Sequence, residues 1–160
     1  MANAEVAVLL EMIDQAFDHS AWHGTNLKGS IRGVSAKEAA WRPGKGRHNV
    51  WELVVHAAYW KYTVRRRILA EKRGSFELQG SNWFARPERS ATTDAAWKAD
   101  VALLVRTHQS LRAVVEGLSG KDLDATPRGS KRNTRAIVVG IAAHDLYHTG
   151  QIQIIKRLMR

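Results

Sequence analysis

The last stretch of the chain constrains the fold most strongly. Apolar residues and two histidines recur there at intervals of three and four positions, the period of one face of an α-helix: Ile137, Ile141, His144, His148, Ile152, Ile155 and Met159. Residues four apart lie one turn apart on the same helical face, so His144 and His148 can direct both imidazoles to one point. Because the seam is otherwise apolar, we expect both histidines to point into the core of a helical protein.

Three earlier segments have the same period. Apolar residues at helical spacing predict helices over residues 4–19, 49–74 and 92–120, and the final seam belongs to a fourth helix over residues 133–160. No stretch alternates in the manner of a strand, and no internal repeat is present. Four amphipathic helices in a chain of this length predict an all-α fold, a four-helix bundle in a single domain spanning residues 1–160. The two long connections between helices leave the topology open.

Capping chemistry marks several helix starts. Ser35 is followed three positions later by Glu38, which predicts a short helical turn over residues 35–40, and Asn49 is followed in the same way by Glu52. The stretch from Gly74 to residue 91 has no sustained period and contains Gly and Pro, so we expect a loop there.

The charge balance raises the question of an anionic partner. Lys and Arg number 25 against 15 Asp and Glu, for a net charge of +10. Such a balance suits nucleic acid or an anionic small substrate. The basic residues are scattered, however, so a solvated surface is the favoured interpretation and nucleic acid is not the favoured partner.

Cysteine is absent from the sequence, so any thiol chemistry needs an external thiol. No apolar run approaches the roughly 20 residues of a membrane-spanning helix, and we expect no membrane partner. The first residues lack the basic and apolar regions of a secretory signal, so the expected location is cytoplasmic.

Two buried imidazoles one turn apart would leave ring nitrogens unsatisfied at about 1–3 kcal/mol each, a cost that a divalent ion removes. A third ligand from a facing helix would complete a site with three protein ligands and an open position. His56 lies inside the second predicted helix, whereas His48 precedes its cap, and about 12 Å of helix axis separates them, so both cannot reach one ion. Glu52 fits a capping role or a contact behind the ligands equally well, and His108 fits a role as a hydrogen-bond donor to a ligand or as a substrate contact.

The order of these features resembles the DinB-like superfamily. A long helix contains Trp51-Glu52-Leu53-Val54-Val55-His56, and a distant His144-x-x-x-His148 is followed by Gly150-Gln151. The resemblance covers nearly the whole chain. It implies a four-helix bundle of up-down-down-up topology, usually dimeric, in which His56, His144 and His148 hold nickel, zinc or a similar divalent ion.

Relatives in this superfamily include thiol-dependent transferases and isomerases that use mycothiol or bacillithiol, and metal-dependent hydrolases. The resemblance therefore implies a metal-dependent enzyme that activates water or an external low-molecular-weight thiol toward a small-molecule substrate. The rival hypothesis is a non-catalytic basic module that binds nucleic acid and uses its histidines structurally. The sequence identifies neither a general acid nor the substrate.

Apolar residues exceed what the four seams need, which predicts a homodimer. The surplus residues are Val55, Tyr59, Tyr62, Trp83 and Phe84.

Overall fold

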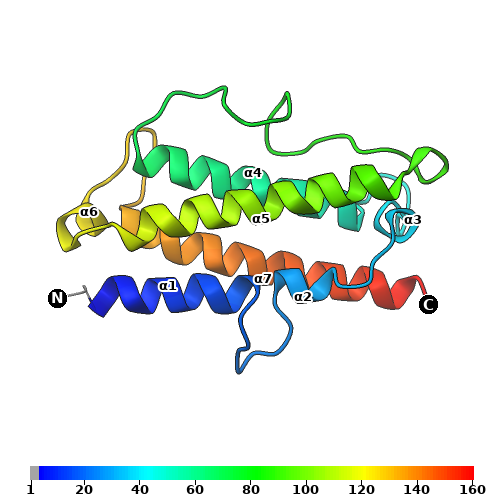
Figure 1. The fold of residues 1–160 in the computed structure, drawn as a ribbon, viewed down its shortest axis with the longest axis horizontal. Helices are drawn as coiled ribbons and strands as arrows, with labels where there is room; N and C mark the ends of the chain where they lie inside the picture. The colour runs from blue at the N-terminus through cyan, green and yellow to red at the C-terminus, as the bar shows by residue number, and fades with distance from the viewer. Residues whose placement is uncertain (1–3) are drawn as a thin grey trace.

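The computed structural model describes residues 4–160, and all regular structure in this range is helical (Figure 1). Four long helices dominate: α1 (Ala4–Phe17), α4 (Val50–Ile68), α5 (Asp94–Glu116) and α7 (Thr134–Leu158). Short elements lie between them: α2 (Leu27–Ser30), α3 (Ala36–Ala39), the 3-10 helix η1 (Arg89–Ala91) and α6 (Gly120–Asp124). The predicted all-α fold is confirmed.

The long helices lie along one another as a bundle. α4 packs most extensively on α5, α1 packs along α7, and α4 also packs on α7. In Figure 1, α1 and α7 run from left to right and α4 and α5 run from right to left. No helix of the described part is both long enough and apolar enough to cross a membrane.

Side-chain caps begin the helices where the sequence places them. Ser35 and Glu38 form a capping box at α3, and Asn49 and Glu52 form one at α4. Each box satisfies backbone N–H groups that have no partner inside the helix. α6 was not predicted; its own capping box, formed by Ser119 and Asp122, begins a helix of five residues.

The predicted end of the second long helix is wrong. α4 ends at Ile68, six residues before Gly74. Ala70 has a φ of 55°, which a helix cannot continue through, and the chain then folds back on the helix end. Arg66 donates a hydrogen bond of 2.9 Å to the backbone carbonyl of Glu71, and Arg65 forms an ion pair with the Glu71 carboxylate. These contacts fix the start of the long connection between α4 and α5.

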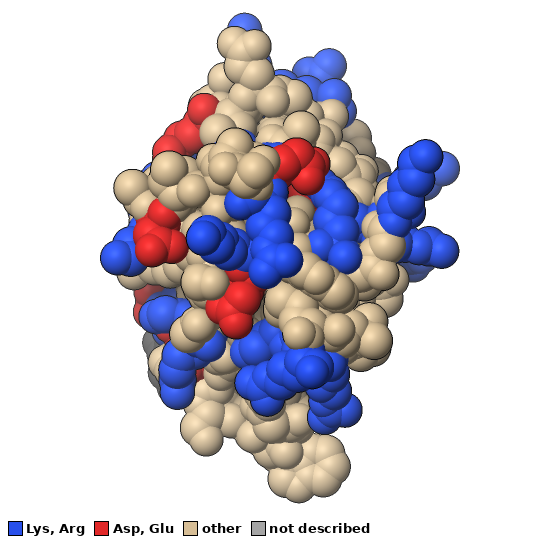
Figure 2. Space-filling model, turned by 90° about the vertical axis from the view of Figure 1, so that its right-hand side faces the viewer, with Lys and Arg blue, Asp and Glu red and all other residues tan. Residues whose placement is uncertain are grey.

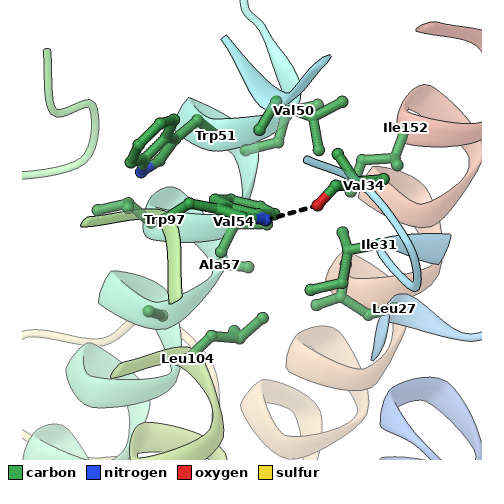
Figure 3. Close-up of a cluster of buried hydrophobic side chains, with 14 of the residues drawn as sticks. Leu27, Ile31, Val34, Val50, Trp51, Val54, Ala57, Trp97, Leu104 and Ile152 are labelled. Carbon is green, nitrogen blue, oxygen red and sulfur yellow. Dashed lines mark hydrogen bonds between the residues drawn. The ribbon is translucent and has the colours of Figure 1, made fainter. Parts of the chain in front are cut away.

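Two buried tryptophans anchor the larger apolar cluster (Figure 3). The rings of Trp51 on α4 and Trp97 on α5 meet edge to face, with centroids 5.3 Å apart. Trp97 Nε1 donates to the Val34 carbonyl at 2.8 Å, and Trp51 Nε1 donates to the Asp100 carboxylate at 2.6 Å. Both indoles are therefore buried with their polar atoms satisfied.

A buried ion pair joins α4 to α7. Lys61 and Asp145 are almost completely inaccessible to solvent, and the Lys61 ammonium donates to one Asp145 oxygen. The same ammonium lies 5.0 Å from the centre of the Phe17 ring. The second oxygen of Asp145 is buried and has no hydrogen-bond partner in the described part of the chain. Burial raises the pKa of the Asp145 carboxyl, and the nearby Lys61 charge opposes that shift.

The long connection covers part of the surface that sequence analysis assigned to a dimer interface. Val55 and Phe84 are buried within the chain. Tyr59 and Tyr62 are half-buried and pack against the ring of Phe76. These side chains therefore pack against other parts of the same chain, and the homodimer stays a prediction that needs a different surface.

A three-histidine candidate metal centre

Three imidazoles from two helices converge on one point. His56 comes from α4, and His144 and His148 come from α7. The Nε2 atom of His144 lies 3.2 Å from Nε2 of His56 and 3.0 Å from Nε2 of His148. One nitrogen from each ring lies within 4.8 Å of the other two. For comparison, the nitrogens of a tetrahedral zinc site with bonds of about 2.0–2.1 Å are roughly 3.3 Å apart.

The outer nitrogens of two rings are fixed by oxygen acceptors. His56 Nδ1 donates to the backbone carbonyl of Asn82 at 2.7 Å, and His148 Nδ1 donates to Oε1 of Gln151 at 2.6 Å. A neutral imidazole carries one proton, and these bonds place it on Nδ1. The Nε2 atoms of His56 and His148 therefore present lone pairs to the centre.

His144 cannot satisfy this arrangement alone. Its Nδ1 is buried and has no hydrogen-bond partner among residues 4–160. If the His144 proton is on Nε2, one N–H faces the lone pairs of both His56 and His148, and the buried Nδ1 stays unpaired. If the proton is on Nδ1, the three Nε2 lone pairs face one another and the buried Nδ1–H has no acceptor. A divalent cation accepts all three lone pairs at once, so the donor set fits a metal ion.

Burial keeps the three rings neutral, which is the form that binds metals. Desolvation lowers the pKa of His56 to about 4 and that of His144 to about 3. The pKa of His148 is lowered by the same cause. Protons therefore compete weakly with a cation for these nitrogens at neutral pH.

Aromatic rings enclose the group. Trp83 stacks on His56 with ring centroids 3.9 Å apart and planes inclined by 11°. It also stacks on His48, with centroids 3.6 Å apart. Trp60 meets the rings of His56 and His144 edge on, each at 6.3 Å. These contacts limit the orientations open to the ligand rings and exclude water from part of their surface.

His48 and Glu52 lie beside the group and outside it. His48 Nδ1 is 3.0 Å from a Glu52 oxygen, and Arg42 forms two hydrogen bonds of 2.6 and 2.9 Å to the same carboxylate. Glu52 also completes the cap at Asn49. The capping role is therefore present, and the hydrogen bonds of the Glu52 carboxylate go to Arg42, His48 and Asn49 instead of His56.

His108 lies elsewhere in the bundle. Its ring stacks on Phe17 at 3.6 Å, and its buried Nδ1 has no hydrogen-bond partner among the residues that the structure describes. Burial lowers its pKa to about 2, and the positive charges of Lys61 and Arg112 act in the same direction. Within residues 4–160, the three-histidine group does not include it, so neither role suggested by the sequence has support from its contacts.

Three residues support the site without having been predicted to do so: Gln151 and Trp83, which sequence analysis named in other connections, and Asn82. Gln151 lies three positions after His148, a spacing that predicts a contact on one helical face. Asn82 and Trp83 lie in the aperiodic connection between α4 and α5, where no pattern marks them. Asn82 accepts from His56 through its backbone and from Trp60 Nε1 through its side chain at 2.9 Å. Its φ of 63° is one that Asn tolerates better than most residues.

Comparison with known families agrees with this geometry. The family model described as the DinB superfamily matches residues 21–152. No curated protein and no solved structure matches the chain. The matched region contains all three histidines, the whole of α4, and α7 as far as Ile152. The chain belongs to the DinB superfamily.

Proposed function

We propose that the protein is a metal-dependent enzyme in which His56, His144 and His148 hold a divalent cation, nickel or zinc. The observation that carries the proposal is the convergence of three Nε2 atoms that lack the protons to satisfy one another. Membership in the DinB superfamily supports it. A bound ion would lower the pKa of a water or thiol ligand and so supply a nucleophile near neutral pH.

The character of the three ligands favours an anionic nucleophile. All three are neutral imidazoles, and no carboxylate joins the group among the described residues. The ligands therefore leave the charge of a cation uncompensated, which favours hydroxide or thiolate as its partner. Since the chain has no Cys, a thiol must be an external low-molecular-weight compound. The two reaction classes are hydrolysis and thiol S-transfer, in which the thiol loses its proton and its sulfur displaces a leaving group from the substrate.

A hollow lined by two neighbours of His56, though by none of the three histidines, supports a small-molecule substrate. About 640 Å³ lies between α4 and the following connection, and Trp60 and Asn82, which touch His56, form part of its wall. Tyr59, Tyr62 and Phe76 provide aromatic surface, and the lining contains no carboxylate. The basic side chains in this lining are Arg66, Arg67 and Arg73. Their positive charge favours a substrate with an anionic group.

Cobalt substitution tests the proposal. Three protein ligands leave a coordination position open, so the visible spectrum of the cobalt protein should change when azide or a small thiol is added. The His108→Ala variant should keep its cobalt, since that ring stacks on Phe17. A spectrum indifferent to azide, thiols and pH, with cobalt lost in His108→Ala, would indicate a closed structural site instead of an enzyme.

The nucleic-acid hypothesis rests on the net charge of +10. It predicts oligonucleotide affinity that falls linearly with salt concentration on a log-log plot.

A cytoplasmic location and a homodimer remain part of the proposal for a metal-dependent enzyme.

A further inference from the structure

The end of the bundle opposite α6 carries a concentration of positive charge (Figures 1 and 2). A hollow of about 370 Å³ opens there, and its wall contains four basic side chains from three parts of the chain. Arg32 precedes α3, Arg89 begins η1, and Lys156 and Arg160 come from the end of α7 and the residues after it. We call this hollow the cationic end pocket.

Three of these cations have no ion pair in the described part of the chain. Arg42, Arg86, Arg106, Arg112 and Arg135 each pair with a carboxylate. Arg32, Arg89 and Arg160 are exposed, and they form no such pair with a described residue. Lys156 is held in place because its ammonium donates to the Ser30 carbonyl at 2.8 Å. The pocket therefore gathers positive charge that the protein itself leaves unneutralised.

Among the described residues, the wall contains one carboxylate side chain, and its oxygens already accept hydrogen bonds. Glu38 accepts hydrogen bonds of 2.8 Å from the backbone N–H and the hydroxyl of Ser35, as part of the cap of α3. These bonds hold the pKa of Glu38 below its usual value, and the charges of Lys156 and Arg160 add to the effect. One carboxylate thus faces four cations, and its position is set by helix capping.

We propose that the cationic end pocket binds a small, multiply charged anion of the phosphate-bearing class. Arginine suits this role because its planar guanidinium donates two parallel hydrogen bonds to phosphate oxygens. Cations approaching from three segments match an anion with several charged oxygens better than a single carboxylate. Trp41 and Met159 supply apolar wall for the uncharged part of such a ligand. The concave shape and its volume favour a small molecule over an extended polymer.

This pocket is separate from the three-histidine group. Lys156 follows His148 by eight positions on α7, which is about 12 Å along the helix axis. No ligand histidine lines the pocket. Anion binding here is therefore independent of metal binding, and the two can be tested apart.

Calorimetric titration with inorganic pyrophosphate at about physiological ionic strength tests the proposal. We expect stoichiometric binding by the wild-type protein and at least a tenfold loss of affinity in Arg32→Gln/Arg160→Gln. The matched control is Lys131→Gln/Arg132→Gln, which removes the same charge from exposed residues before α7 and should bind as the wild type does. His148→Ala should also bind normally, because no ligand histidine lines the pocket. Loss of binding in that variant would show that a metal ion holds the pyrophosphate, which would overturn the proposal.

Equal loss in both double variants, or absence of binding by the wild type, would overturn the proposal. Competition distinguishes the source of the phosphate. Vesicles with anionic headgroups and a single-stranded oligonucleotide are added to the pyrophosphate complex. We expect neither to displace pyrophosphate at equal phosphate concentration. Displacement by either, with sensitivity to Arg32→Gln/Arg160→Gln, would replace the small-molecule assignment by a membrane or nucleic-acid surface.

Discussion

At the scale of single residues, the orientation of the His56 ring depends on the backbone of Asn82. The carbonyl that accepts from His56 Nδ1 belongs to a residue with positive φ. Asn82→Val introduces a β-branched side chain that is strained at this φ, so the carbonyl should move. We expect metal affinity to fall by roughly 10–100-fold, as when a partner behind a metal ligand is lost.

The matched control is Asn82→Gly, which adopts positive φ without strain and keeps the carbonyl. It loses only the hydrogen bond from Trp60 and should keep most of the affinity. Competition with a chromogenic chelator measures both variants. Equal losses in the two would show that the side chain, and not the carbonyl, supports the site.

His108 should make the stability of the protein depend on pH. Its pKa is about 2 in the folded protein because it is buried, against about 6.5 when unfolded. The unfolded state therefore binds more protons below pH 6.5, and stability falls as the pH falls. Between pH 7 and pH 5, the His108 ring should lower the free energy of unfolding of the wild type by about 2 kcal/mol, and His108→Leu should remove this contribution. Urea unfolding of the metal-free proteins at both pH values measures it; parallel pH profiles for variant and wild type would contradict the assignment.

At the scale of helices, the Lys61–Asp145 pair fixes α4 against α7 close to the histidines. Lys61→Met leaves the Asp145 carboxyl buried without its cation, which typically costs about 3–5 kcal/mol of unfolding free energy. Protonation of the carboxyl limits this cost, since burial already raises its pKa. Lys61→Met/Asp145→Leu removes both charges and should recover much of the loss. Denaturant unfolding distinguishes these outcomes, and a double variant less stable than the single one would contradict the argument.

The exposed face of α7 is the surface to which we assign self-association. Tyr147, Ile154 and Leu158 lie at positions i, i+7 and i+11, which share one helical face, and each is at least 60% exposed. Ile154→Lys should convert a homodimer into a monomer, as measured by light scattering at tens of micromolar. Leu69→Lys, at an exposed apolar residue after α4, is the control and should stay dimeric. A monomeric wild-type protein would contradict the dimer itself.

The elements that the sequence predicted well are those with a long period and a capping residue. α5 and α7 begin close to the predicted starts of 92 and 133, and the side chains of Thr93 and Asn133 cap them. The end of α4 could not be predicted, because it depends on Ala70 and on contacts with Glu71 that no periodicity encodes. α6 is too short to show a period.

At the scale of the whole molecule, the candidate site was predictable in part. Helical spacing brings His144 and His148 together, and the position of His56 inside a facing helix selects it over His48. The enclosing contacts were not predictable, because Asn82 and Trp83 reach the histidines from a loop distant in sequence. The cationic end pocket likewise gathers residues from three separate segments, none of which is a continuous basic run.

Metal content tests the central claim most directly. The protein is purified without a metal-affinity tag, and elemental analysis compares the wild type with single variants. Since each ligand contributes one nitrogen, His144→Ala and His148→Ala should lose stoichiometric metal. His48→Ala should retain it, because that ring bonds to Glu52 and stacks on Trp83 outside the group. We predict stoichiometric nickel or zinc in the wild type and, among the variants, only in His48→Ala. Stoichiometric metal retained by His148→Ala would contradict the claim.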